Sequence, residues 1–320
     1  MSRIFVGLDT SNYTTSAALC DENANILCNV KLPLPVAEGE RGLRQSDAVF
    51  SHVKSMPEAA EILRRTMNEA GINRNDIAAV GVSRSPRDAE GSYMPCFLAG
   101  IASAEIAAAL LGVPVMRFSH QAGHVMAALH SAGADHLLGG EFAAFHVSGG
   151  TTDVLYVRPH DEYVFDVERI GGTKDINAGQ AIDRAGVMMG LRFPCGAEME
   201  KLASSVSRKV PRAKISVQET ACNLSGLENK AAELYKETSD AALVSAFVLD
   251  FVGRTLRGMR DGVREKCGNI PIVYAGGVMS CTRLKEMLQD DYAYFAQPQF
   301  SSDNAAGAAL LTRYMFLRKE

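Results

Sequence analysis

The stretch FAAFHVSGGTTDVLYV, residues 142–157, indicates the fold class most directly. Two apolar runs flank a turn of small residues, which is the pattern of a β-hairpin. A third apolar run follows at 163–167, so three successive strands are expected. The beginning of the chain repeats this arrangement, because the runs 4–10 and 15–20 flank a polar turn and the run 26–32 follows. The sequence therefore contains a weak internal duplication.

Beyond each three-strand unit, the pattern changes to helical periodicity with a few short buried strands. In the first half we expect helices at 48–70, 95–111 and 121–131, and strands at 77–82 and 113–118. In the second half we expect helices at 177–189, 241–266, 282–289 and 304–317, and a strand at 270–275. This alternation predicts an α/β fold in which helices cover mixed sheets. Two such units facing one another would leave a central cleft, where ligands usually lie.

Length and composition limit the function classes. The 320 residues suit two domains, and 47% hydrophobic with 22% charged residues is the balance of a globular protein with a large core. No apolar run reaches 18 residues and the N-terminus lacks a signal-peptide pattern, so no membrane association is expected. Seven scattered cysteines without a CxxC pair indicate reduced thiols and a cytoplasmic location.

Two glycine-containing turns are candidate phosphate or nucleotide contacts. The turn 148–152 could bring backbone N–H groups and hydroxyls close to an anion, although a plain tight hairpin explains it as well. The segment 275–278 ends a strand and is expected to open a helix, which is a phosphate-binding arrangement or simply a closely packed helix start. Neither turn is a Walker A loop or a GxGxxG motif.

A histidine pair is the candidate metal site. His120 and His124 are spaced i, i+4, so both imidazoles lie on one helix face and could share a metal, although such pairs also occur by chance. Gln121 replaces the glutamate of an HExxH motif, which disfavours a zinc peptidase. Asp303 is a candidate third ligand, but helix capping explains it equally well. Asp183, on a later helix, could hold a ribose hydroxyl, and Gly196 would permit close nucleotide approach.

Taken in order, these motifs resemble those of one family over nearly the whole chain. The sequence resembles the tRNA threonylcarbamoyladenosine transferases, the TsaD family. The matching stretches are GLDTS at 7–11, HQAGH at 120–124, VSGG at 147–150, the segment 172–196, LSGL at 224–227, AGGV at 275–278 and SDNAA at 302–306.

The resemblance implies a two-domain actin-like ATPase (ASKHA) fold with duplicated mixed-sheet units and a central cleft. Its N-terminal subdomain would comprise 1–137, closed by the C-terminal helix 303–320, and its C-terminal subdomain 138–302. The implied activity is metal-assisted transfer of a threonylcarbamoyl group from threonylcarbamoyl-adenylate to adenosine in the tRNA anticodon loop, with AMP leaving and no covalent intermediate.

The resemblance also implies roles for individual residues. His120, His124 and Asp303 would be catalytic as ligands of one divalent metal, iron or zinc. ATP, AMP or threonylcarbamoyl-adenylate would bind between the two halves, against Val147, Ser148, Gly149, Gly150, Asp183, Gly196, Gly276, Gly277 and Cys281.

The chain also departs from the family pattern. Where the family has the glycine-rich TxGPGLxGSL, residues 83–92 read SRSPRDAEGS, with charged residues in place of the flexible glycine. Tyr13-Thr14 replaces an acidic pair, Cys281 an asparagine and Glu228 a lysine. These changes fall on the substrate side and indicate a divergent paralogue. Two alternatives therefore stay open: a carbamoyltransferase acting on a small molecule, and a non-catalytic nucleotide-binding partner subunit.

The net charge of −4 argues against strong binding of nucleic acid by this chain alone, because proteins that bind nucleic acid without accessory subunits usually have a basic face. Family members act with a smaller paralogous subunit and an ATPase of the same pathway, so we expect tRNA binding to need accessory subunits. The helix 48–70 is the expected partner face, since Met56, Ala60, Leu63 and Met67 recur at helical spacing. A stripe facing the core would give the same spacing.

Overall fold

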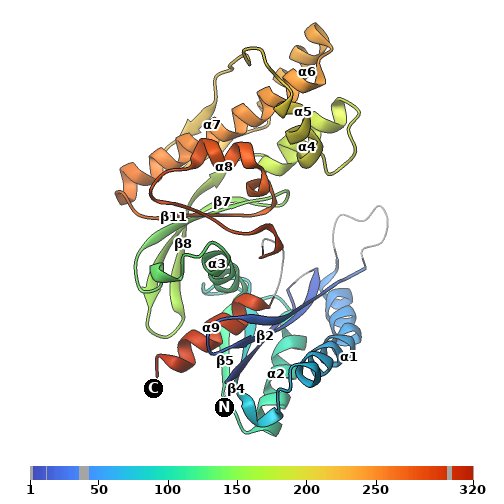
Figure 1. Cartoon of the computed structure of the whole chain (residues 1–320), viewed down its shortest axis with the longest axis vertical. Coiled ribbons are helices and arrows are strands. Elements are labelled where there is room, and N and C mark those ends of the chain that lie inside the picture. Colours follow the sequence, from blue (N-terminus) through green and yellow to red (C-terminus); the bar gives the residue numbers. More distant parts are fainter. Residues whose placement is uncertain (1–2, 12, 36–42, 301–304, 320) are drawn as a thin grey trace. The chain divides into compact units, whose positions relative to one another are not determined.

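The computed structural model describes residues 3–11, 13–35, 43–300 and 305–319, and it forms two compact α/β units (Figure 1). Unit 1 comprises Met1–Ala127, His160–Val167 and Ser302–Glu320. Unit 2 comprises Ala128–Pro159 and Glu168–Ser301. Among the described residues, no helix combines the length and apolar character needed to cross a bilayer.

Unit 1 contains a five-stranded sheet in the order β3-β2-β1-β4-β5. The strands are β1 (Ile4–Asp9), β2 (Thr14–Asp21), β3 (Ile26–Pro33), β4 (Ile77–Ser85) and β5 (Val115–Ser119). The first three are antiparallel, and β4 and β5 continue the sheet in parallel with β1. All six residues of β1 are buried, as expected for a central strand covered on both faces.

Four helices belong wholly or largely to unit 1: α1 (Gln45–Glu69), α2 (Phe97–Leu111), α3 (His120–Ser131) and α9 (Ala306–Leu317). Side chains alternate between the faces of β1. Ile4, Val6 and Leu8 pack with residues of α1 and α2 in one core cluster. Phe5 and Gly7 instead meet α9, where the Phe5 ring contacts that of Phe316.

Glycines permit the close approach of α9 to the sheet. A Cβ built on Gly7 would lie 2.4 Å from the backbone oxygen of Ala305 and from the backbone nitrogen of Ala309. A Cβ on Gly81 of β4 would lie 1.7 Å from Oγ1 of Thr312. The C-terminal helix therefore packs directly on the backbone of the two central strands.

Unit 2 contains a seven-stranded sheet in the order β12-β11-β6-β7-β8-β10-β9. Its strands are β6 (Phe142–Val147), β7 (Thr152–His160), β8 (Val164–Thr173), β9 (Ser216–Gln218), β10 (Ala221–Asn223), β11 (Ile272–Ala275) and β12 (Ala293–Phe295). Read as β8-β7-β6-β11-β12, five of them repeat the order of the first sheet, including the parallel pairing of β6 with β11. The duplication predicted from the sequence is confirmed.

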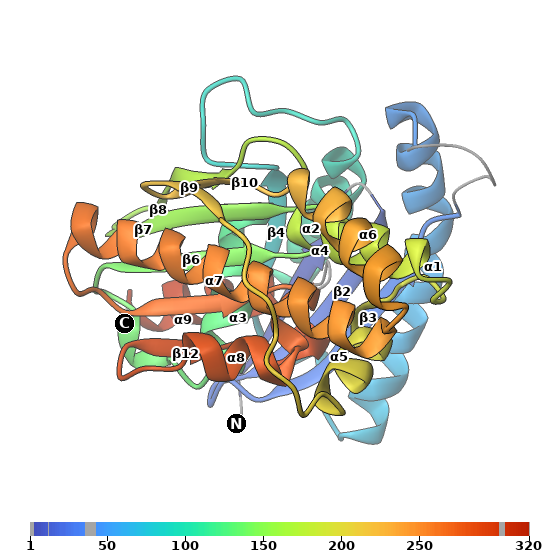
Figure 2. The same cartoon turned by 90° about the horizontal axis from the view of Figure 1, so that it is seen from above.

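The helices of unit 2 are α4 (Ala178–Met188), α5 (Gly196–Ser204), α6 (Gly226–Thr238), α7 (Ala241–Cys267) and α8 (Thr282–Leu288). The longest, α7, lies along the sheet and packs against the other four (Figure 2). Asp240 caps it by accepting a 2.9 Å hydrogen bond from the backbone N–H of Leu243. Short 3-10 turns occupy Arg74–Asp76, Asp135–Leu137, Gly277–Ser280 and Pro298–Phe300.

The expected helices and strands are present with ends that differ by a few residues. The larger differences are β8, which runs to Thr173 instead of ending at 167, and α5, α6 and the short strands β9, β10 and β12, for which the sequence analysis gave no range. Strands of three residues carry too little periodicity to be recognised. Residues 301–304 lie outside the described residues, and they include the predicted ligand Asp303 and the expected first residue of the last helix.

The close packing of α9 predicts that Gly7→Ala destabilises the protein by about 2 kcal/mol or more, because the added methyl meets backbone atoms that cannot rotate away. Chemical denaturation measures the change in the free energy of unfolding. Gly140→Ala is the matched control, since its Cβ would have only an ordinary 3.5 Å contact. Equal stability of the two variants would contradict this description of the α9 packing.

Candidate functional site

A pocket of about 550 Å³ in unit 2 brings together several residues singled out in the sequence. Five predicted nucleotide contacts line it: Gly149, Asp183, Gly196, Gly277 and Cys281. Its other lining residues are Gly179, Ile182, Phe193, Pro194, Ala197, Glu200, Leu249, Val278 and Ser280. The volume lies in the range of small-molecule sites, and the lining is mainly apolar with a few polar groups.

The turn after β6 supplies one side of this pocket. The Ser148 hydroxyl accepts hydrogen bonds from the N–H groups of Gly150 and Thr151, at 3.2 and 3.0 Å. These two N–H groups are therefore used within the turn, as in a plain tight hairpin. Of the four predicted residues 147–150, Gly149 alone is among the lining residues.

Helix α4 begins directly behind this turn. The N–H of Gly179 donates to the backbone oxygen of Ser148 at 3.1 Å, and a Cβ on Gly179 would lie 2.6 Å from Cα of Gly149. Asp183 follows four residues later on the same helix face and also lines the pocket. Its Oδ1 accepts a 2.8 Å hydrogen bond from the N–H of Cys195, the residue before Gly196. The sequence analysis missed Gly179, although it lies within the matching segment 172–196.

The glycine pair after β11 differs from the prediction of a strand running into a helix. Gly277–Ser280 form only a 3-10 turn, Cys281 is extended, and α8 begins at Thr282. Gly276 has φ +102°, and a Cβ there would lie 2.2 Å from the backbone oxygen of Val147. Gly276 is thus required for close packing against the end of β6, whereas Gly277 lines the pocket. The glycine pair therefore opens a short 3-10 helix, and the α-helix begins only at Thr282.

The predicted histidine pair lies in unit 1, at the start of α3. The Nε2 atoms of His120 and His124 face one another at 2.9 Å. On the opposite side of its ring, Nδ1 of His120 is 2.8 Å from Oδ2 of Asp9. When His120 is neutral, the carboxylate of Asp9 accepts a hydrogen bond from its Nδ1–H, which leaves the lone pair of His120 on Nε2, toward His124.

Asp9 is buried at the end of β1 and is held from three directions. Besides His120, its carboxylate accepts hydrogen bonds from the N–H of Ser11 at 2.8 Å and from the hydroxyl of Ser83. Burial raises the pKa of Asp9, but the charge and hydrogen bond of His120, with those from Ser83 and Ser11, outweigh it and lower the pKa below its ordinary value. Asp9 was not predicted as a site residue, although an acid ending a fully apolar strand was a visible signal.

Two imidazole nitrogens facing one another, with a carboxylate behind one ring, fit a divalent metal. Asp303, the predicted third ligand, lies outside the described residues. Within the described ranges, no group of three or more His, Cys, Asp and Glu side chains is arranged to hold a metal ion. The complete metal triad therefore stays a prediction.

Comparison with solved structures identifies the class of fold. Component A of the Acidaminococcus fermentans (R)-2-hydroxyglutaryl-CoA dehydratase matches with a TM-score of 0.52 at 15% identity, over 98% of this chain and 99% of that one. HypF of T. kodakarensis matches with a TM-score of 0.57 at 12% identity, over 99% of this chain and 47% of that one. Together with the repeated strand order, these similarities confirm an α/β actin-like ATPase (ASKHA) fold.

Comparison of sequences identifies the family. The family model of TsaD, tRNA N6-adenosine threonylcarbamoyltransferase, matches residues 46–310. Relatives with that name are 27% identical over 310 residues in Methanopyrus kandleri and 28% over 323 residues in Streptococcus pyogenes. These alignments cover 95% and 96% of this chain, and 85% and 89% of the relatives. The chain belongs to the TsaD family.

The pocket predicts opposite effects for two neighbouring glycines. A Cβ at Gly149 or at Gly150 would have no neighbouring atom within 4 Å, so we expect both positions to accept valine without loss of fold. Because Gly149 alone lines the pocket, Gly149→Val should weaken binding of AMP by about tenfold or more, and Gly150→Val should not. Calorimetric titration measures both affinities. Unchanged AMP affinity in the Gly149 variant would place the nucleotide elsewhere.

Proposed function

We propose that this protein transfers a threonylcarbamoyl group from threonylcarbamoyl-adenylate to adenosine in the tRNA anticodon loop. Membership of the TsaD family supports the reaction. The observation that carries the proposal is the convergence of Gly149, Asp183, Gly196 and Gly277 on one pocket of unit 2. We place the reaction in the cytoplasm, where tRNA is modified and where the seven unpaired cysteines stay reduced.

The pocket of unit 2 suits the adenylate part of the donor. Gly149, Gly179 and Gly277 have no side chains, so a ligand can approach their backbone closely. Asp183 uses Oδ1 for the N–H of Cys195, and its other oxygen would accept a hydrogen bond from a ribose hydroxyl. Apolar side chains of the lining, such as Ile182, Leu249 and Val278, would contact the adenine ring.

His120 and His124, with Asp303, would hold one divalent metal, iron or zinc. When bound, such a metal polarises a carbonyl as a Lewis acid, here that of the carbamoyl group. Asp9 would keep the proton of His120 on Nδ1 and fix the orientation of the ring. In the transfer itself, the adenosine amine would attack the carbamoyl carbon and lose one proton to solvent, the bond from that carbon to the phosphate oxygen would break, and AMP would leave with the bonding electrons.

A second candidate function is carbamoyl-type transfer to a small molecule. It is favoured by one observation, the charged loop 84–92 in place of the family's glycine-rich motif. This alternative shares the adenylate pocket and the histidine pair with the first, and differs only in the acceptor. The same assay separates the two.

The direct test incubates the chain with threonylcarbamoyl-adenylate and unmodified tRNA, with the accessory subunits, and analyses the nucleosides by mass spectrometry. We expect threonylcarbamoyladenosine as product, and Asp183→Asn should lower kcat/KM about tenfold or more. Asp291→Asn, an exposed carboxylate outside the pocket, is the matched control. Transfer to small acceptors but not to tRNA would support the second candidate, and no transfer to either would contradict both.

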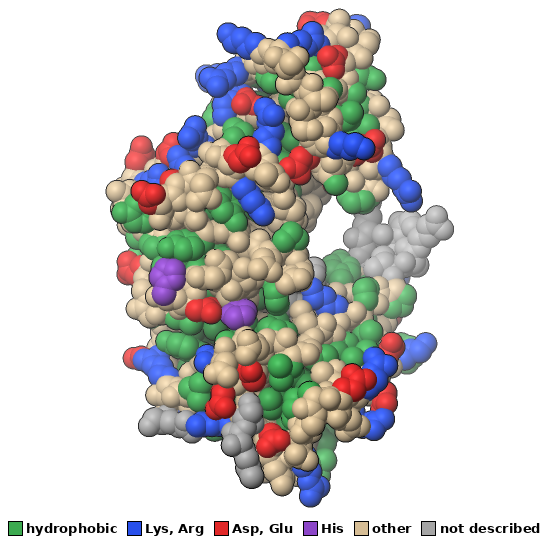
Figure 3. Space-filling model, in the orientation of Figure 1, with side chains coloured by type: hydrophobic (Ala, Val, Ile, Leu, Met, Phe, Trp, Pro, Cys, Tyr) green, Lys and Arg blue, Asp and Glu red, His purple; other side chains and the backbone are tan. Residues whose placement is uncertain are grey.

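Binding of tRNA is proposed to depend on accessory subunits, a smaller paralogous subunit and an ATPase of the same pathway. The chain has a net charge of −4. On the face drawn in Figure 3, Lys and Arg side chains are interspersed with Asp and Glu. Since phosphate contacts dominate the affinity of proteins for nucleic acids, the isolated chain should bind tRNA weakly and with strong salt sensitivity.

The structure corrects the partner face predicted on α1. Leu63 and Met67 pack against the core of unit 1, so that part of the predicted stripe faces inward. The exposed apolar side chains of α1 are instead Phe50, 70% exposed, and Val53, 58% exposed. On α2, Leu98, Ile106 and Leu110 are also exposed. We propose these five residues as the α1–α2 apolar face, which a smaller paralogous subunit would cover.

This assignment predicts that Phe50→Asp with Val53→Asp weakens association with the smaller subunit at least tenfold, because two charges replace apolar contacts. The two positions are one helical turn apart, so both face the same partner surface. Analytical ultracentrifugation measures the association. Tyr292→Asp, an exposed aromatic in unit 2, is the control. Equal association constants of the two variants would show that α1 is not part of the interface.

A further inference from the structure

A further pocket of unit 2, of about 630 Å³, shares no lining residue with the adenylate pocket. Three elements surround it: α7, α8 and the connection from α5 to β9, residues 205–215, which passes across α7 in Figure 2. Each element contributes arginine: Arg212 comes from the connection, Arg254 and Arg257 from α7, and Arg283 from α8. The rest of the lining is Ile215, Asp250, Gly258, Asp261, Glu286 and Met287.

Packing within unit 2 holds these three elements together. Nε of Arg254 donates to Oδ2 of Asp250 at 2.7 Å, and its Nη1 donates to the backbone oxygen of Ala213 at 3.1 Å, which ties the connection to α7. On the other side, α8 packs directly on α7, because a Cβ on Gly253 would lie 2.5 Å from the sulfur of Met287. The arginines of the pocket therefore extend from a fixed frame.

Two of the pocket's three carboxylates are already paired with arginines. Asp250 lies 2.7 Å from Nε of Arg254, and Asp261 lies 2.8 Å from Nη2 of Arg260, a buried arginine outside the lining. The third carboxylate, Glu286, is exposed and has no ion pair within the described part of the chain. Only one carboxylate of this pocket is therefore free to oppose an anion.

Three of the arginines lack a carboxylate partner among the described residues, namely Arg212, Arg257 and Arg283, whereas most arginines of unit 2 have one. We name these three residues the arginine face. Arg212 and Arg257 are exposed. Arg283 is half-buried with its Nε enclosed, but its two terminal nitrogens reach the surface. Three accessible guanidinium groups therefore surround one hollow, and an anion bound there would offset their mutual repulsion.

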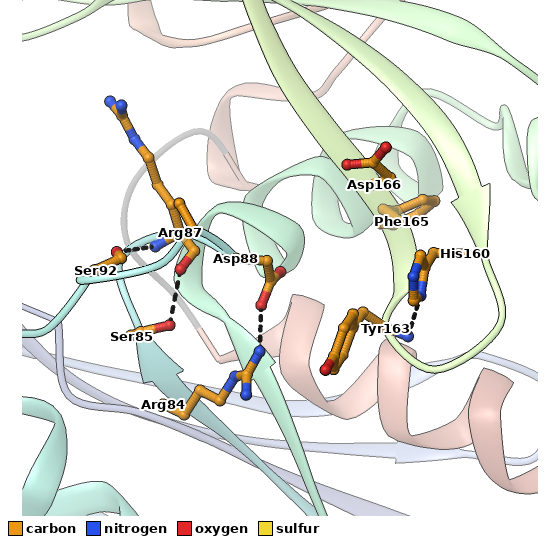
Figure 4. A pocket seen from close by; sticks show the side chains of 10 residues that line it. Arg84, Ser85, Arg87, Asp88, Ser92, His160, Tyr163, Phe165 and Asp166 are labelled. Atoms are coloured by element: carbon orange, nitrogen blue, oxygen red, sulfur yellow. Dashed lines mark hydrogen bonds and ion pairs between the residues drawn. The ribbon is translucent and has the colours of Figure 1, made fainter.

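The pocket of unit 1 shows the contrast. It measures about 590 Å³ and lies between the loop after β4 and the tip that joins β7 to β8 (Figure 4). Its Arg84 donates to Oδ1 of Asp88 at 2.8 Å, and Cζ of Arg84 lies 5.0 Å from the centroid of the Tyr163 ring. The charge of Arg84 is thus compensated by a carboxylate of the same pocket, whereas the arginine face has no such partner.

The arrangement of the arginine face fits a chain of anionic groups better than a single small anion. Its guanidinium groups come from three separate elements and are accessible, and a guanidinium matches phosphate oxygens with two parallel donors. Exposed Lys209 and Lys214 flank Arg212 on the connection and extend the positive charge beyond the pocket. The phosphate backbone of a nucleic acid carries charges repeated along a strand in this way.

The position of the arginine face within unit 2 favours RNA over an acidic protein. Arg283 lies two residues after Cys281, which lines the adenylate pocket. A strand bound at the arginine face therefore lies beside the helix that begins at the donor pocket. Contacts to phosphates position a nucleic acid without reading its sequence, which suits a surface next to the reaction.

We propose that the arginine face binds the phosphate backbone of the tRNA that the protein modifies. Arg212, Arg257 and Arg283 each contact phosphate oxygens, and Glu286 opposes them. The inference rests on the proposed function, since that function names tRNA as the acceptor. Three phosphate contacts leave the isolated chain a weak binder, in keeping with its net charge of −4.

The test measures binding of an unmodified tRNA transcript to the full chain by fluorescence anisotropy, from about 50 to about 200 mM salt. Arg212→Gln, Arg257→Gln and Arg283→Gln together should weaken binding about tenfold or more at about 100 mM salt. The slope of log K against log salt should fall in magnitude by about two, because two to three phosphate contacts are lost. Glu286→Gln should act in the opposite direction and strengthen binding about twofold or more, since it removes the opposing carboxylate.

The matched control is Lys54→Gln with Arg65→Gln and Arg74→Gln, three exposed cations of unit 1. It removes the same amount of positive charge, so unchanged binding separates a local contact from the overall charge of the chain. Circular dichroism checks the fold of every variant. Should the triple variant fail to fold, Arg212→Gln with Arg257→Gln, which alters exposed side chains alone, decides together with Glu286→Gln.

The proposal is overturned if the unaltered chain binds no tRNA at about 50 mM salt, or if the folded triple variant binds tRNA as tightly as the unaltered chain. Loss of poly-L-glutamate binding in that variant, with tRNA affinity kept, would assign the face to an acidic protein. Inorganic pyrophosphate that displaces tRNA at equal phosphate concentration would assign it to a small anion. Weakened binding by the unit 1 control to the same extent would also overturn the proposal.

The transfer assay separates this inference from the proposed function. If the chain modifies tRNA, the triple variant should raise KM for tRNA about tenfold with little change in kcat, because these arginines do not line the adenylate pocket. Modification with an unchanged KM in the variant would overturn the arginine face alone. Arginine-dependent tRNA binding without any transfer would instead support the arginine face and contradict the proposed function.

Discussion

The candidate site of unit 1 depends on one interaction, the hydrogen bond between the buried carboxylate of Asp9 and Nδ1 of His120. This bond links the end of β1 to the first turn of α3, and the bonds that the same carboxylate accepts from Ser83 and Ser11 link it to β4 and to the turn after β1. A buried carboxylate is tolerated only when it is paired and hydrogen-bonded, so the strand ends and the helix must stay in this arrangement. The orientation of His120, and through it the contact with His124, follows from that constraint.

The duplicated sheet explains why the adenylate pocket and the pocket of unit 1 occur where they do. In each unit, the segment after a central strand runs into a ligand-sized pocket: the turn after β6 and the segment after β11 in unit 2, and the loop after β4 in unit 1. The ends of strands in α/β sheets commonly supply ligand contacts, because loops there are free to vary while the sheet fixes their starting points. The end of β4 and the loop after it carry charged residues, and Arg84, Arg87 and Asp88 line the pocket of unit 1.

Much of the fold could be predicted because its strands are long apolar runs such as 4–10 and 142–147, whose pattern decides their place in a sheet. The short strands β9, β10 and β12 could not, since three residues have no recognisable period. Part of the site could also be predicted. The i, i+4 spacing placed His120 beside His124, and the motif matches assigned Gly149 and Asp183 to one nucleotide site. Asp9 was missed because two of its partners, Ser83 and His120, are 74 and 111 residues away in the chain. Leu63 and Met67 were assigned to a partner face because helical spacing identifies an apolar stripe but not what covers it.

The most direct test of the central account is a crystal structure of the chain with a non-hydrolysable threonylcarbamoyl-adenylate analogue and a divalent metal, recorded at the metal's absorption edge. The account predicts the adenosine of the analogue in the pocket formed by Gly149, Asp183 and Gly277. It also predicts an anomalous peak at the imidazoles of His120 and His124. An analogue bound outside that pocket, or a metal bound away from both histidines, would contradict it.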